Sequence, residues 1–535
     1  MTEQTKKEKI MTKKAATKQM PQTTAGQLSS IVKSCRDIMR KDKGLNGDID
    51  RLPMLTWIMF LKFLDDMERL REEEAKLAGE KYAPAVKSPY RWRDWAAKED
   101  GITGEDLIRF INNDECVRPD GSRGPGLFAY LRSLEGTGKK RDRRNVVATV
   151  FRGTLNRMIN GYLLRDVINK INSIHFNSSE EIHTLSFLYE SLLKEMRDAA
   201  GDAGEFYTPR AVVKFMVTVT DPRLGDTMLD PACGTGGFLA ETFEHIKKQC
   251  KTVEDHRVLQ EETIFGGEAK SLPYLLCQMN LLLHGLDSPQ IDPENSLRKP
   301  LKDIRDDERV DVILTNPPFG GEEEKGIQSN FPQDRQTSET ALLFLQLIMK
   351  KLRKPGHLGK KEGGRAAVIV PNGTLFGDGV CARIKEDLLK EFNLRTIVRL
   401  PNGVFSPYTN IPTNILFFEN TGKPTKEIWY YEQPLPEGRK NYTKTQPIQF
   451  DEFTPCVKWW KKHEENEHAW KVKAEDVFKY NDKKELISAN LDVKNPNAGE
   501  DFEHMPPEQL IEDILVKEQK ITELMKEIKA SLVAK

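Results

Sequence analysis

The sequence has few cysteines, and their spacing does not suggest a metal site or a disulfide framework. Seven cysteines are spread over 535 residues, and none belongs to a C-x-x-C pair. This usage is typical of a reduced compartment. No apolar run is long enough to cross a membrane, and the polar N-terminus lacks the apolar segment of a signal peptide. We therefore expect a cytoplasmic protein without a membrane segment.

The chain also lacks net charge. Lys and Arg together number 82, and so do Asp and Glu. Any contact with nucleic acid must therefore come from local basic patches or from a partner protein. The basic cluster K-K-R-D-R-R at 139–144 is compatible with phosphate contacts and equally with a solvated surface. The nine histidines show no H-E-x-x-H or similar spacing, so we predict no metal site.

The length predicts two or three folding units, and the pattern of polar and apolar residues changes along the chain. Residues 1–24 are polar and aperiodic, which predicts a disordered tail. Residues 25–174 carry apolar residues at helical spacing and predict a helical N-terminal domain. We expect a catalytic domain at 175–480 and a C-terminal tail at 481–535. The tail has a coiled-coil-like helix in which Ile514, Ile521 and Ile528 recur every seven residues.

The expected catalytic domain alternates short apolar runs with helical stretches. The apolar runs predict strands at 227–229, 263–265, 310–314, 366–370, 396–400 and 414–418. Helical patterns lie between some of them, at 238–248 and 272–286. This alternation is typical of an α/β fold with a doubly wound sheet buried on both faces. Ligands on such a sheet bind beyond the carboxyl ends of the strands.

The first motif, D-P-A-C-G-T-G-G-F at 230–238, directly follows a predicted strand and precedes a helix. Its glycines let the backbone approach a ligand closely. The third glycine of a dinucleotide fingerprint is replaced by Leu239, and no Gly-Lys-Ser/Thr follows, so NAD and a Walker loop are disfavoured. S-adenosylmethionine, which is cationic and carries no phosphate, suits this acidic pocket better. We assign cofactor binding here to Asp230, Gly234, Thr235, Gly236 and Gly237.

An acidic residue, Glu268, ends the next predicted strand. At that position a carboxylate can accept hydrogen bonds from both hydroxyls of a ribose. We therefore add Glu268 to the predicted cofactor site.

The second motif is N-P-P-F at 316–319, again directly after a predicted strand. Two prolines fix a rigid loop, so the Asn316 amide and the Pro317 carbonyl can act as acceptors facing one space. Acceptors that hold both N–H groups of an aromatic amine favour a tetrahedral nitrogen and free its lone pair for attack on a methyl group. Phe319 could stack on a base flipped out of the duplex. The predicted catalytic residues are Asn316, Pro317, Pro318 and Phe319.

Carbon-5 methylation of cytosine requires a cysteine nucleophile, usually in a Pro-Cys-Gln context. In this chain Pro455-Cys456 is followed by Val457. The sequence therefore disfavours covalent catalysis. Two other functions remain open from the residues alone: a methyltransferase acting on RNA or on a protein glutamine, and a non-catalytic scaffold of a DNA complex.

Together the two motifs resemble those of the amino-methyltransferases of DNA. The segment G-E-F-Y-T-P-R at 204–210 resembles a cofactor segment that modification subunits of type I restriction-modification systems carry upstream of the first motif. The similarity covers most of the chain and includes P-N-G at 371–373 and L-P-N-G-V-F at 400–405. The resemblance implies an adenine-N6 DNA methyltransferase that protects host DNA from cleavage.

The resemblance also implies roles for residues outside the two motifs. The methionine end of the cofactor would be held by Glu205, Phe206, Tyr207, Thr208, Pro209 and Arg210. An adenine contact is implied at Asn295, where related enzymes often carry an acidic residue. A second aromatic face for the flipped base is implied at Phe405 or Tyr408.

The implied partners are duplex DNA, a specificity subunit joined by two copies of this chain, and a restriction subunit. No extra segment of 100 to 150 residues between or after the motifs offers a target-recognition domain of ordinary size. We therefore expect sequence recognition to come from another subunit. The heptad-patterned C-terminal helix suits docking to that subunit, and packing onto its own catalytic domain is the alternative.

Overall fold

We describe a computed structural model of the chain. It describes residues 25–79, 81–134, 142–174, 208–406, 409, 411–443 and 445–497, together with 515, 518, 519 and 525. The expected N-terminal tail and the heptad isoleucines of the C-terminal helix lie outside these residues, as does 139–141 of the basic cluster.

The first part of the described chain is helical, as the sequence predicts. Its longest helix, α3 (Asp48–Ala78), runs through the middle of this part. Trp57 and Phe60 of α3 are fully buried, and their rings pack against Phe128 and Phe151. The other helices are α2 (Ala25–Met39), α4 (Trp92–Trp95), α5 (Gly104–Asn112), α6 (Leu127–Arg132), α7 (Arg143–Arg152) and α8 (Gly161–Asn172). A short hairpin of β1 (Cys116–Val117) and β2 (Arg123–Gly124) interrupts them.

The second part is built on one nine-stranded sheet, which confirms the expected α/β fold. The strands follow the order β11-β10-β8-β9-β7-β6-β3-β4-β5 across the sheet. Their bounds are β3 (Met228–Asp230), β4 (Ile264–Gly267), β5 (Gln290–Asp292), β6 (Val312–Thr315), β7 (Arg365–Pro371), β8 (Asn393–Arg399), β9 (Thr413–Glu419), β10 (Glu427–Glu432) and β11 (Ala469–Lys473).

The sheet is mixed. Strands β5, β4, β3, β6 and β7 are parallel neighbours, whereas β9 runs antiparallel between β7 and β8, and β11 is antiparallel at one edge. All six predicted strands are present, with bounds shifted by one to three residues. The sequence analysis missed β5, β10 and β11.

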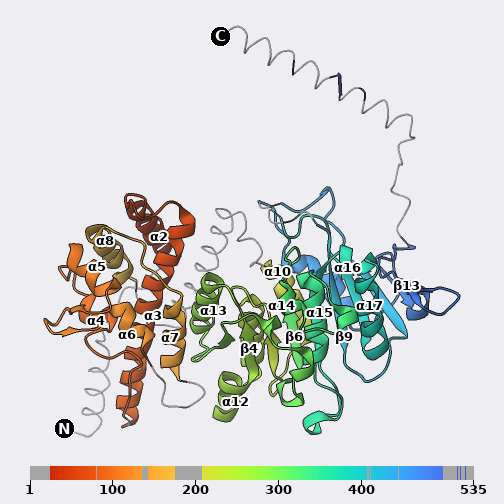
Figure 1. Cartoon of the computed structure of the whole chain (residues 1–535), viewed down its shortest axis with the longest axis horizontal. Helices are drawn as coiled ribbons and strands as arrows, with labels where there is room; N and C mark the ends of the chain where they lie inside the picture. Colours follow the sequence, from red (N-terminus) through yellow and green to blue (C-terminus); the bar gives the residue numbers. More distant parts are fainter. Residues whose placement is uncertain are drawn as a thin grey trace, which may run out of the picture.

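Helices cover both faces of the sheet, so its strands are buried on both sides (Figure 1). Along β7 the side chains alternate: Ala367 and Ile369 join one hydrophobic cluster, and Val368 and Val370 join another. The first cluster includes α10 (Arg210–Thr220), α11 (Gly237–Lys247), α13 (Ser271–Leu283) and α18 (Thr454–Trp459). The second includes α15 (Thr340–Lys351) and α17 (Val380–Glu391). The remaining helices are α12 (Val253–Val258), α14 (Lys325–Gln328) and α16 (Gly373–Phe376).

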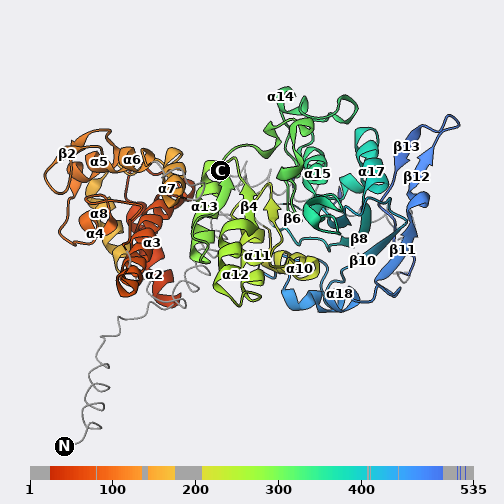
Figure 2. The ribbon, with the colours of Figure 1, turned by 90° about the horizontal axis from the view of Figure 1, so that it is seen from below.

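Helix α13 joins the two parts of the molecule. It lies between the N-terminal helices and the sheet in both views (Figures 1 and 2). Contacts to α3 and α7 on one side and to α11 on the other bury nearly every residue of α13. This burial explains why the helix is the most apolar of the chain. None of the helices in the described ranges is long and apolar enough to span a bilayer.

The chain beyond residue 480 continues the folded body for a short distance. Strand β13 (Leu486–Ala489) pairs with β12 (Phe478–Tyr480), and Leu491 is fully buried in the second cluster. An ion pair between Arg399 and Asp492 fixes this segment at the end of β8.

Candidate active site

The glycine motif forms a tight turn between β3 and α11. Gly234 and Gly236 have φ angles of 52° and 79°, in the left-handed region that favours glycine. A Cβ atom on Gly236 would lie 2.7 Å from the Sγ of Cys277 on α13. The turn therefore requires glycine at 236 both for its backbone conformation and for its close approach to α13.

Asp230 ends β3 at the floor of this turn and is almost completely buried. Its Oδ1 accepts hydrogen bonds from the Thr315 hydroxyl at 2.6 Å and from the Ala232 backbone N–H at 3.2 Å. Burial raises the pKa of Asp230 to about 7, and the nearby Glu268 carboxylate adds to the shift. The carboxyl group is thus poised to ionise beside a cation.

Glu268 follows β4 and faces the same turn. One of its oxygens accepts a hydrogen bond from the backbone N–H of Gly234 at 3.0 Å, and the other accepts one from the backbone N–H of Lys270 at 2.8 Å. Burial raises the pKa of Glu268 above its usual value. Each carboxylate oxygen retains a second lone pair, so Glu268 can hold the glycine turn and still accept a hydrogen bond from a ligand.

The second motif directly follows β6, the neighbour of β3. Asn316 donates through Nδ2 to the Thr208 hydroxyl at 3.1 Å. Its Oδ1 is buried and has no hydrogen-bond partner among the described residues. Buried acceptors are normally paired, so this oxygen is available to a ligand donor. Phe319 packs edge-on against Phe405, with ring centroids 6.0 Å apart, and Phe405 is buried.

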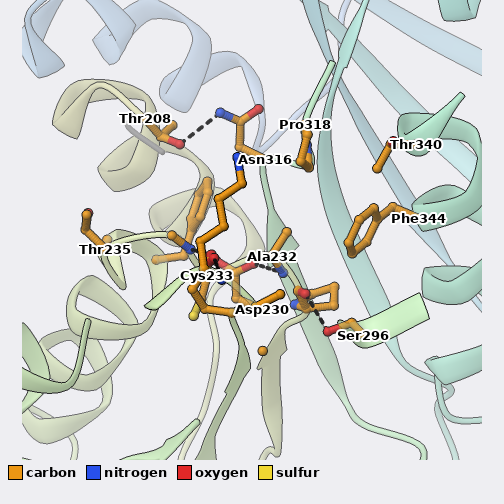
Figure 3. A pocket seen from close by; sticks show the side chains of 18 of the residues that line it. Thr208, Asp230, Ala232, Cys233, Thr235, Ser296, Asn316, Pro318, Thr340 and Phe344 are labelled. Carbon is orange, nitrogen blue, oxygen red and sulfur yellow. Dashed lines mark hydrogen bonds between the residues drawn. The ribbon is translucent and has the colours of Figure 1, made fainter. Parts of the chain in front are cut away.

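A pocket of about 210 Å³ lies between these motifs at the carboxyl ends of β3, β4 and β6. Figure 3 shows Asn316 and Thr208 at one end, Asp230 and Ser296 at the other, and Thr235 and Phe344 on opposite walls. The predicted residues that line it are Thr208, Arg210, Asp230, Gly234, Thr235, Gly237, Glu268, Asn295, Asn316 and Pro318. The two motifs, 86 positions apart, thus meet in one cavity.

Several predicted residues do not line this pocket. The structure places Pro209, Gly236, Pro317, Phe319 and Phe405 outside the pocket lining. Pro209 precedes α10, and a Cβ atom on Gly236 would point at Cys277. Asn295 does line it, and its Oδ1 caps a short helical turn by accepting the Leu297 N–H. Glu205, Phe206, Tyr207 and Tyr408 fall outside the described residues.

The sequence analysis missed several lining residues. Asn280 of α13 is fully buried, donates to the Thr235 carbonyl at 3.0 Å, and leaves its Oδ1 without a partner among the described residues. A polar side chain inside the most apolar helix was a signal for it. Cys233 and Phe238 belong to the glycine motif but were not assigned to the site. The others, which carry no motif signal, include Lys270, Ser296, Glu323, Thr340 and Phe344.

Two family models match the chain. The family described as N-6 DNA Methylase matches residues 180–501, and the HsdM N-terminal domain matches residues 28–171. A curated relative, the EcoEI methylase subunit of a type I restriction enzyme from Escherichia coli, is 48% identical over 516 residues. That alignment covers 95% of this chain and 98% of the relative.

Solved structures agree with these matches. A modification subunit assigned to a type I restriction enzyme of Vibrio vulnificus YJ016 is 69% identical, with a TM-score of 0.85. The match covers 91% of this chain and all of that one. A chain from a study of complex assembly in the type I restriction-modification system is 39% identical, with a TM-score of 0.73, over 96% of this chain and all of that one.

Proposed function

Because this chain belongs to the methylase subunits of type I restriction enzymes, we propose that S-adenosylmethionine bound in the pocket beside β3 and β4 supplies its methyl group. The chain is the modification subunit of such a system and methylates adenine at N6 in DNA. Membership in this family implies a S-adenosylmethionine-dependent enzyme. The residues that hold the cofactor and the target base are our proposal.

The chemistry of the pocket fits this cofactor. Asp230 and Glu268 offer carboxylates to a cationic, ribose-bearing ligand, and the backbone at Gly234 and Gly237 is open to close approach. The Oδ1 of Asn280, which accepts no hydrogen bond from the part of the chain that the structure describes, offers one more acceptor. We propose that Arg210, which also lines the pocket, lies with Thr208 near the carboxylate of the methionine part.

The single observation that carries the proposed catalytic role is the buried Oδ1 of Asn316 in the same cavity, which no described residue meets with a hydrogen bond. The cofactor supplies an electrophilic methyl group on a sulfonium. We propose that Asn316 Oδ1 and the Pro317 carbonyl accept hydrogen bonds from the two N–H groups of the adenine amine, so that its lone pair is less delocalised into the ring and free to attack. The nitrogen would form the new N–C bond as the methyl–sulfur bond breaks and leaves a neutral thioether, and the methylated nitrogen would then lose one proton to solvent. Phe319 would stack on the flipped base, with Phe405 or Tyr408 as a second aromatic face.

We predict that cofactor affinity rises as the pH is raised through about 7, the pKa of Asp230. A cationic ligand favours the ionised carboxylate, so binding below this pH must first release its proton. Linkage then predicts a Kd about tenfold lower at pH 8 than at pH 6. Calorimetry across this range tests it. Asp230→Asn should bind more weakly and without this pH dependence; an unchanged pH profile in that variant would assign the proton to another group.

The chain is part of a type I restriction-modification complex that acts on DNA. We propose that two copies join one specificity subunit, which reads the DNA sequence, and that a restriction subunit adds cleavage. The balanced charge of this chain, 82 basic and 82 acidic residues, supports shared DNA binding. The heptad isoleucines Ile514, Ile521 and Ile528 support a helical docking element.

We predict that a version ending before Pro506 binds cofactor as the full-length chain does but gains no methylation activity from the specificity subunit. Without the terminal helix, the apolar docking surface is lost. The test compares both forms, with and without the co-encoded specificity subunit, in cofactor titrations and in methylation of a defined site. Site-specific methylation by the isolated chain would contradict this assignment, and so would full activity of the truncated one.

A further inference from the structure

Within the described ranges, the side-chain amide of Asn316 is held at one end only. Its Nδ2 donates to the Thr208 hydroxyl at 3.1 Å, and its Oδ1 is buried and faces no donor among the described residues. Both residues line the pocket, and Figure 3 shows this hydrogen bond at the end of the cavity opposite Ser296. Thr208 precedes α10, far from the N-P-P-F loop in the sequence, so the contact joins two separate motifs.

We propose that Thr208 is a positioning residue for the catalytic amide. The proposal rests on the proposed role of Asn316. An asparagine side chain can rotate about its last torsion and can present either the oxygen or the NH₂ group to a ligand. The substrate amine brings N–H donors, so only the oxygen is productive. By accepting from Nδ2, Thr208 holds the amide plane and turns Oδ1 toward the pocket.

The same hydrogen bond also strengthens the acceptor. Hydrogen bonds in a chain polarise one another, and this effect is larger away from bulk water. Donation from Nδ2 to Thr208 places more negative charge on Oδ1, which then grips the adenine N–H groups more strongly. Thr208 therefore acts through Asn316 without touching the reacting nitrogen.

The test uses Thr208→Val, which keeps the side-chain shape but removes the hydroxyl, and Thr208→Ser, which keeps the hydroxyl. In the complete complex with saturating cofactor, Thr208→Val should lower the single-turnover methylation rate about fivefold to tenfold, the effect of one hydrogen bond. Thr208→Ser should stay within about twofold of the wild type. Thr218→Val is the matched control, because the Thr218 hydroxyl only back-bonds to the Lys214 carbonyl within α10.

A double-mutant cycle separates this role from direct cofactor binding. In an Asn316→Ala background there is no side-chain amide for Thr208 to hold. The Thr208→Val loss should therefore shrink to about twofold or less in that background. An equal loss in both backgrounds, failure of Ser to restore the rate, or a change confined to cofactor Kd would overturn the proposal. A wild-type rate in Asn316→Ala would instead refute the catalytic role of Asn316.

Discussion

Replacing Asn316 with Ala should lower the single-turnover rate of methyl transfer about 10²- to 10³-fold, the usual effect of removing a group that acts mainly in the transition state. The Oδ1 of Asn316 has no partner among the described residues, so its loss breaks no hydrogen bond to that oxygen. Among the described residues, the only side-chain hydrogen bond removed is the one from Nδ2 to Thr208. We therefore expect the fold and the glycine turn to remain intact.

The measurement compares the complete complex of wild type and variant under saturating cofactor, with labelled methyl incorporation into a duplex that carries the target site. Cofactor Kd is measured in parallel and should change by no more than about twofold, because Asn316 acts on the amine. A loss of cofactor affinity as large as the loss of rate would contradict this role. It would place Asn316 among the residues that hold the cofactor.

Gly236→Asp should have the opposite effect and weaken cofactor binding about 100-fold or more, because overpacking and a new charge act together at the ligand-binding turn. The sequence suggests that the new side chain would enter the space where the backbone meets the cofactor. The structure gives another direction: the Cβ would point at Cys277 Sγ, 2.7 Å away. The substitution therefore pushes the turn away from α13 and toward the ligand.

Gly225→Asp is a matched control for the backbone strain. Gly225 has a φ of 88°, close to the 79° of Gly236, but a Cβ there would meet nothing within 4 Å. In this variant the left-handed backbone should lower the free energy of unfolding by the same amount, about 1 kcal/mol. Its affinity for the cofactor should be normal. Calorimetric Kd values of both variants test the comparison. Unchanged affinity in Gly236→Asp would mean that the turn does not contact the cofactor.

The sequence predicted the central strands because they are apolar runs buried on both faces, as in the alternation along β7. It missed β5 (Gln290–Asp292), which has three residues and only one buried side chain, Ile291. It also missed the outer strands β10, in which glutamates flank apolar and aromatic residues, and β11, in which lysines alternate with apolar residues. The antiparallel direction of β9 depends on pairing with β7 and β8, which local periodicity does not encode.

For the site, the sequence predicted best those residues that lie at the carboxyl end of a strand or directly after it. Asp230, Glu268 and Asn316 were predicted on that basis, and they line one pocket; their individual roles remain predictions. Asn280 and Phe344 come from helices distant in the sequence, and they reach the cavity only through packing. The hydrogen bond between Asn316 and Thr208 was likewise invisible, because it joins two segments 108 positions apart.

The central claim is that this chain, assembled with its specificity subunit, transfers a methyl group from S-adenosylmethionine to N6 of adenine in duplex DNA through the pocket at Asn316. The most direct measurement follows tritiated methyl groups into DNA, RNA and protein fractions and identifies the modified nucleoside. We predict that the label appears only in DNA, as N6-methyldeoxyadenosine, and falls to near background with Asn316→Ala. Label in RNA, in protein or on cytosine, or full labelling by Asn316→Ala, would contradict the account.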